Sequence, residues 1–179
     1  MSEPVKLWRY TIPSVEREGW AIVVIGSDGF CSAVSDWGNY SFRWTATGCA
    51  DFRDFVLRAQ SSPAYWINKL GGDDVYDAAA TEAEVKDYIE DPDSFGSTKS
   101  AKARRAREIE LLQDSDLRRP EGFDRWLEQT GLDDAWEYRR EKPDPHATAF
   151  VTRAMPRICA LIQAELAAER GAGVVSAPV

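Results

Sequence analysis

The chain has 179 residues, of which 44% are hydrophobic and 29% are charged, and its formal net charge at pH 7 is −8. This mix is typical of a globular protein, so we expect one domain over residues 1–170 and a flexible tail over residues 171–179. No apolar run approaches the roughly 20 residues that cross a bilayer, and the N-terminus lacks a secretion signal, so we expect a cytoplasmic protein with no membrane partner.

The first third of the chain predicts strands, within residues 5–46. In residues 5–12, VKLWRYTI, apolar side chains alternate, which places Trp8 and Tyr10 on one face. Residues 19–26, GWAIVVIG, form a continuous apolar run of the kind that a well-covered strand shows. The dipeptide Asp28-Gly29 favours a two-residue hairpin turn between this strand and the next, residues 30–35.

The stretch SDWGNYSFRW, residues 35–44, concentrates aromatic residues around a turn. Tyr40, Phe42 and Trp44 alternate with polar residues, so we interpret them as the core-facing side of a fourth strand. Trp37 differs because it lies in the turn itself, where a large ring is harder to bury. It is therefore a candidate contact residue.

From residue 51 onward the apolar period changes from two to about 3.6, which predicts helices over residues 51–170. Asp51 is expected to cap the first helix, and Ser62 with Pro63 to open the second. Thr81 and Glu84 have the spacing of a capping box at the start of a third helix, which Pro92 ends. Its buried stripe is expected to hold Val85, Tyr88 and Ile89.

Further helices are predicted near residues 99–113, 120–131 and 146–170, the last bent at Pro156. The last helix aligns its apolar residues, which are Phe150, Ala154, Ile158, Leu161, Ile162 and Leu166. Strands followed by helices predict an α+β fold in which a four-stranded antiparallel meander is covered by the C-terminal helices.

The charge is concentrated in residues 73–93, which hold nine acidic residues and a single basic residue, Lys86. The residues before and after this segment are balanced in charge. We expect the acidic segment to meet the basic surface of a host protein or nucleoprotein complex, because complementary charge speeds encounter. With Trp37, the candidate partner-binding residues are Asp73, Asp74, Asp77, Glu84, Asp87, Glu90 and Asp91.

Residue types that carry catalysis are sparse. The chain has three cysteines without a CxxC pair and one histidine, His146, and it lacks a phosphate loop and a nucleophile elbow. We therefore expect no catalytic or metal-binding residues and no cofactor. Magnesium ligation by Asp28, Asp36 or Asp51 is the weaker interpretation, because each has a turn or cap role. The five basic residues of residues 99–107 spread around a helix, and with the acidic pI this favours a solvated helix over nucleic-acid binding.

Residues 6–44 resemble the N-terminal part of a family of small proteins from bacteriophages, prophages and other bacterial mobile elements. The likeness is carried by LWRYTIP, SDG and the SDWGNY stretch. It implies an accessory role in the conflict between phage and host, exerted by binding and inhibiting a host protein. Two alternatives remain open: a small metal-dependent enzyme acting on nucleotides or nucleic acid, and an immunity protein that neutralises a toxin.

Overall fold

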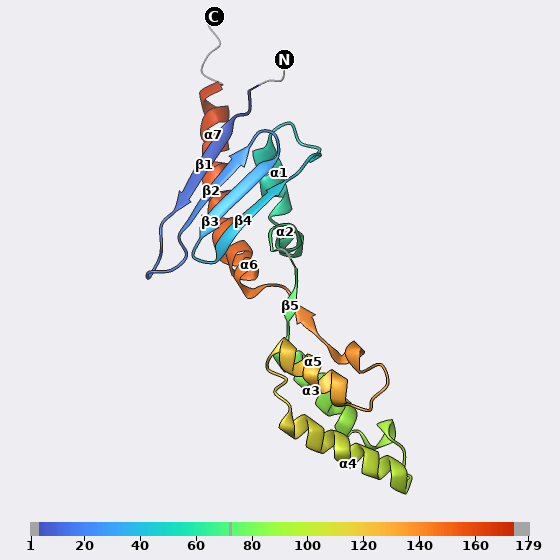
Figure 1. Cartoon of the computed structure of the whole chain (residues 1–179). Helices are drawn as coiled ribbons and strands as arrows, with labels where there is room; N and C mark the ends of the chain where they lie inside the picture. The colour runs from blue at the N-terminus through green and yellow to red at the C-terminus, as the bar shows by residue number, and fades with distance from the viewer. Residues whose placement is uncertain (1–3, 72, 174–179) are drawn as a thin grey trace, which may run out of the picture. The chain divides into compact units, whose positions relative to one another are not determined.

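The computed structural model describes residues 4–71 and 73–173 (Figure 1). The chain divides into two compact units: unit 1 comprises Met1–Asp73 and Pro143–Val179, and unit 2 comprises Asp74–Lys142. Each unit has its own cluster of buried hydrophobic residues. The single domain expected over residues 1–170 stays a prediction. The structure adds that the chain has a second hydrophobic core, in unit 2.

Unit 1 contains a four-stranded antiparallel sheet with the strand order of the sequence. The strands are β1 (Leu7–Ile12), β2 (Ala21–Gly26), β3 (Phe30–Ser35) and β4 (Gly38–Arg43). Tyr10 pairs with Val23, and Val23 with Ala33, so the core-facing residues line up across the sheet. The predicted meander is confirmed.

The connection between β2 and β3 differs from the predicted two-residue turn. Gly26 lies opposite Phe30 in the ladder extended from Ile25 and Cys31, so Ser27, Asp28 and Gly29 form the loop. Only Gly29 of these three residues has a positive φ, at 84°. A Cβ atom at Gly29 would lie 2.0 Å from the carbonyl oxygen of Trp44, so a close approach of the backbone selects glycine here.

The helices of unit 1 are α1 (Phe52–Ala59), α2 (Pro63–Leu70), α6 (Pro145–Ala149) and α7 (Met155–Gly173). Asp51 caps α1 as predicted, because its carboxylate accepts a hydrogen bond from the backbone N–H of Arg53. Between α6 and α7 the chain forms a π-helical turn, Phe150–Ala154. This wide turn directly precedes Pro156, where a regular α-helix would bring the proline ring against the preceding turn.

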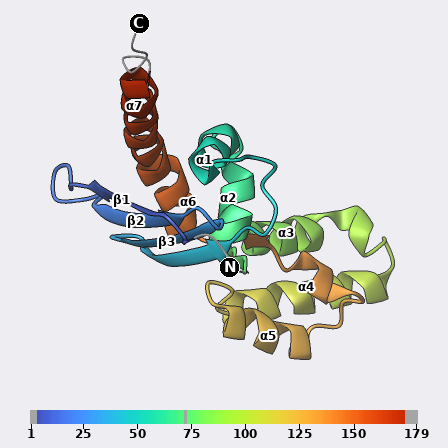
Figure 2. The ribbon, with the colours of Figure 1, turned by 90° about the horizontal axis from the view of Figure 1, so that it is seen from above.

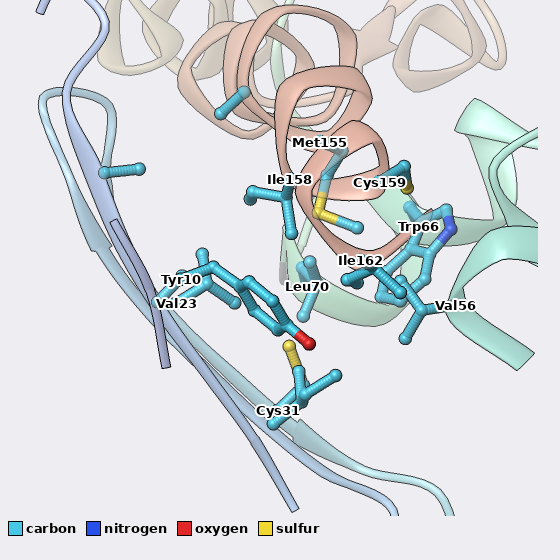
Figure 3. Close-up of a cluster of buried hydrophobic side chains, with 14 of the residues drawn as sticks. Tyr10, Val23, Cys31, Val56, Trp66, Leu70, Met155, Ile158, Cys159 and Ile162 are labelled. Carbon is cyan, nitrogen blue, oxygen red and sulfur yellow. The ribbon is translucent and has the colours of Figure 1, made fainter. Parts of the chain in front are cut away.

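The helices of unit 1 pack on one face of its sheet (Figure 2). Tyr10, Val23 and Cys31 project from the sheet toward Ile158 and Ile162 of α7 (Figure 3). The cluster is completed from α1 and α2 by residues that include Val56, Trp66 and Leu70. Each large apolar side chain buried here contributes about 1.5–3 kcal/mol.

The other face of the sheet is only partly covered within unit 1. Ile22 and Val24 of β2 are half-buried, while Leu7 is 62% and Val34 47% exposed. Although β2 is a continuous apolar run, the helices of unit 1 therefore cover only one of its two faces. Its outward side chains lie between those of β1 and β3.

Unit 2 packs α3 (Ala78–Glu90), α4 (Lys99–Asp114) and α5 (Pro120–Gln129) around one cluster. The buried residues of this cluster are Val85, Ile89, Leu117, Phe123, Trp126, Leu132 and Ala135. Short 3₁₀ turns follow α3 (Pro92–Ser94) and α5 (Ala135–Tyr138). The two ends of the unit are joined because β5 (Val75–Tyr76) pairs with β6 (Glu141–Lys142).

Two local predictions were wrong, and the last helix is longer than expected. The third helix begins at Ala78, since Asp77 caps it through the N–H of Ala80, and Thr81 lies inside the helix instead of capping it. Leu161 is 43% exposed, because it lies about 60° around the helix from Ile158, on the side away from Ile162. The helix α7 extends to Gly173, into the predicted tail, whose residues 174–179 lie outside the described part of the chain.

Candidate functional site

The acidic segment lies mostly on unit 2, along and around α3. Asp73 and Asp74 are exposed in the stretch that leads into β5. Asp77 caps α3, and Asp91 is exposed directly after its last residue. The helix itself presents the remaining predicted contact residues, Glu84, Asp87 and Glu90, to solvent.

Several of these carboxylates are paired within unit 2. Asp77 lies 3.3 Å from the Nζ of Lys142, and Glu84 lies 2.6 Å from a guanidinium nitrogen of Arg140. The backbone N–H of Ala80 and the Lys142 ammonium together hold the pKa of Asp77 below its usual range. These two residues fasten α3 to the chain around β6. Asp77 and Glu84 are therefore less available to a partner than we expected from the sequence.

The carboxylates of Asp87 and Glu90 are not paired with a basic side chain in the described part of the chain. Both are exposed, and neither forms an ion pair among the described residues. The carboxylate of Asp91 instead accepts hydrogen bonds from the N–H of Asp93 and the hydroxyl of Ser94, which caps the 3₁₀ turn. The candidate site thus narrows to Asp87 and Glu90 on α3.

A groove of about 600 Å³ adjoins this face of α3. Glu82, Lys86, Ile89 and Glu90 line one side, and residues 109 and 112–118 line the other. Sequence reasoning missed the groove, because its two sides are at least 19 residues apart in the chain. Its local signal is the pair Asp114 and Asp116, at the end of the basic helix and just after it.

The basic helix α4 is held against α3 through backbone atoms. The guanidinium of Arg105 donates hydrogen bonds to the carbonyl oxygens of Ile89, at 2.7 Å, and Glu90. These carbonyls belong to the last turn of α3, where no N–H group further along the helix is available to donate to them. Arg105 therefore caps α3, and the carboxylate of Glu90 stays free.

Trp37 belongs to unit 1 and lies apart in the chain from the acidic segment. Its ring is half-buried and packs over Gly19, where an added Cβ would lie 3.3 Å from the ring. Arg157 of α7 donates to the carbonyl oxygens of Gly19 and Pro13, which fixes the same loop. Trp37 also lines a hollow of about 280 Å³ with residues that include Arg153.

The residues considered for catalysis have ordinary environments. Burial raises the pKa of the Cys31 thiol to about 12 and that of Cys159 to about 11, so both are neutral core side chains at pH 7. His146 is exposed at the start of α6. Across residues 4–71 and 73–173, no group of three or more histidine, cysteine or acidic side chains is arranged to hold a metal ion.

The aspartates considered as magnesium ligands are engaged elsewhere. Asp28 pairs with Arg43 at 3.0 Å, and Asp36 accepts hydrogen bonds from the N–H groups of Gly19 and Trp20. Asp51 caps α1 and pairs with Arg53. Asp51 thus fills the cap role that the sequence indicated, whereas the carboxylate of Asp36 binds the segment just before β2 instead of its own turn.

Comparison with known proteins gives one match. A family model described as "Phage family" matches residues 2–164, which is most of the chain. No curated protein and no solved structure matches the sequence. Within the described residues, no helix is both long enough and apolar enough to cross a membrane.

Proposed function

The chain belongs to this phage family, and we propose that it is an accessory protein that binds a basic surface of a host protein and thereby inhibits it. The free carboxylates of Asp87 and Glu90 on α3 carry this proposal. Glu90 lines the groove, and neither carboxylate forms an internal ion pair among the described residues.

The distribution of charge between the units supports the same function. Unit 2 contains 19 acidic and 12 basic residues, whereas unit 1 contains 11 and 10. Nearly all of the net charge of −8 is therefore carried by the smaller unit. A field of this kind attracts a basic partner over distances of about a Debye length, which is roughly 8 Å at physiological salt.

Inhibition follows if the partner's basic surface is one that normally binds nucleic acid. Carboxylates on a rigid helix would then occupy positions that phosphates otherwise take, and bound protein would exclude the nucleic acid. Host defence proteins that act on phage nucleic acid have such a surface. An immunity protein that neutralises a basic toxin would use the same face, and the identity of the partner distinguishes these two roles.

The test is capture of a partner from host lysate at about 0.05 M and about 0.5 M salt. The parent is compared with the double variant Asp87→Lys/Glu90→Lys. A matched control, Glu110→Lys/Glu128→Lys, changes exposed residues of α4 and α5 by the same net charge. We expect the parent and the control to retain a partner at low salt and the α3 variant to lose it. Equal capture by all three proteins would exclude the acidic face of α3 as the contact surface.

A further inference from the structure

The groove beside α3 has an apolar floor. Ile109 and Leu112 of α4 are half-buried and expose apolar surface to the groove, and the lining also includes the buried Ile89 and Leu117. A concave surface of this kind gains free energy when apolar side chains cover it, because water is released from both partners.

The rim of the groove is acidic on both sides. Glu82 and Glu90 come from α3, and Asp114 and Asp116 come from the end of α4 and the residues after it. The two bases that line the groove are already paired, Lys86 with Glu82 at 2.5 Å and Arg118 with Asp116 at 2.9 Å.

The pairing leaves a negative charge on each side of the floor. Glu90 and Asp114 have no ion-pair partner in the described part of unit 2. An anionic ligand would be repelled by both, and an uncharged apolar ligand would leave both carboxylates without a counter-charge. The arrangement selects a ligand that is apolar along its centre and positively charged at its edges.

We propose that this groove binds an amphipathic, basic segment of the partner protein, whose apolar side chains lie on the floor and whose lysine or arginine side chains meet Glu90 and Asp114. This inference rests on the proposed function and defines the chemistry of the partner. An amphipathic helix with apolar residues at positions i, i+4 and i+7 matches a groove formed between two helices.

A labelled synthetic peptide of about 15 residues tests this directly, with leucine at those apolar positions and arginine at the flanking ones. One control peptide replaces each leucine by serine, and a second replaces each arginine by glutamine. Fluorescence anisotropy with the full-length protein measures the three dissociation constants. We expect the amphipathic peptide to bind at least about tenfold more tightly than either control. Equal binding of the basic peptide that lacks leucine would overturn the role of the floor.

Two variants locate the binding in the groove. Gln113→Trp adds a large ring at an exposed position of the lining, and its control, Ala103→Trp, adds the same ring to an exposed position of α4 outside the lining. We expect Gln113→Trp alone to weaken peptide binding by about tenfold. The double variant Glu90→Gln/Asp114→Asn should instead reduce the salt dependence of binding. Unchanged affinity in Gln113→Trp and unchanged salt dependence in the double variant would refute the proposal.

The outcomes separate this inference from the proposed function. If partner capture from lysate is lost in Asp87→Lys/Glu90→Lys but retained in Gln113→Trp, the acidic face binds the partner without the groove, and only the inference fails. If capture is unaffected by the α3 variant, the proposed function fails as well.

Discussion

The indole N–H of Trp44 donates a 2.6 Å hydrogen bond to the hydroxyl oxygen of Tyr65, which joins the end of β4 to α2. The ring of Trp44 also lies 5.1 Å from that of Trp66 and 5.7 Å from those of Phe52 and Phe55, as measured between centroids. Only 6% of the Trp44 surface is exposed, so its interpretation as a core residue is confirmed.

Replacing Trp44 by alanine should destabilise the protein by about 3–5 kcal/mol, because it removes a buried ring and leaves a cavity among other aromatic rings. Trp44→Phe keeps part of the packing but loses the hydrogen bond to Tyr65, so a smaller loss is expected. Thermal unfolding followed by circular dichroism compares the three proteins. An unchanged melting temperature in Trp44→Ala would show that this aromatic cluster contributes little to stability.

The sequence patterns did not predict a charge network in unit 1 that surrounds one buried arginine. The side chain of Arg53 is 3% exposed, and its guanidinium lies 2.8 Å from Asp51 and 2.7 Å from Glu169. Glu165 also lies 3.4 Å from the guanidinium and accepts a 2.5 Å hydrogen bond from Tyr10. The network therefore ties α1 and β1 to α7.

Stability should fall in acid through this network. Hydrogen bonding by Arg53 lowers the folded-state pKa of Glu169 below its usual 4.5. Its contribution is therefore complete above pH 4.5 and is lost as the pH falls through the lower, folded-state pKa. Urea unfolding from about pH 6 to about pH 3 should show a decreasing free energy of unfolding.

The variant Arg53→Met provides the control for this pH dependence. It leaves three partly exposed carboxylates without their shared cation, so at neutral pH it should be less stable than the parent. The difference between the two proteins should narrow in acid, because protonated carboxyl groups no longer need the guanidinium. A difference that stays constant from about pH 6 to about pH 3 would contradict this explanation.

In unit 2, the carboxylate of Glu108 is fully buried and accepts hydrogen bonds from the hydroxyl of Thr130, at 2.7 Å, and the N–H of Gly131, at 3.0 Å. Glu108→Ala should cost about 1–3 kcal/mol, because these donors lose their acceptor. Amide hydrogen exchange at Gly131 should accelerate in the variant, while exchange in the sheet of unit 1 stays unchanged. Equal acceleration in both units would indicate global unfolding instead.

His146 should be dispensable. Its side chain is exposed, and the hydrogen bonds it makes among the described residues use backbone atoms, since its N–H donates to Asp144 and its carbonyl oxygen accepts from the N–H of Phe150. The variant His146→Ala should change stability by no more than about 0.5 kcal/mol and leave partner capture unchanged. A large loss of capture in a folded variant would assign the imidazole a role in binding or chemistry.

Much of the fold could be predicted from local patterns. Alternation with a period of two identified β1 and β4, and the change to a period of 3.6 at residue 51 marked the first helix. The errors lie where two local signals compete. Asp77 and Thr81 both have N-cap side chains, and the helix begins at Ala78, capped by Asp77, because Ala78, Ala79 and Ala80 are strong helix formers.

Composition and helical period were enough to predict that an acidic segment is present, that a helix displays part of it, and that Val85 and Ile89 face inward. Tertiary structure decided which carboxylates stay free. Asp77 meets Lys142, and Glu84 meets Arg140, across separations of 65 and 56 residues. Local periodicity carries no information at that range, because such pairs form only when packing and strand pairing bring distant segments together.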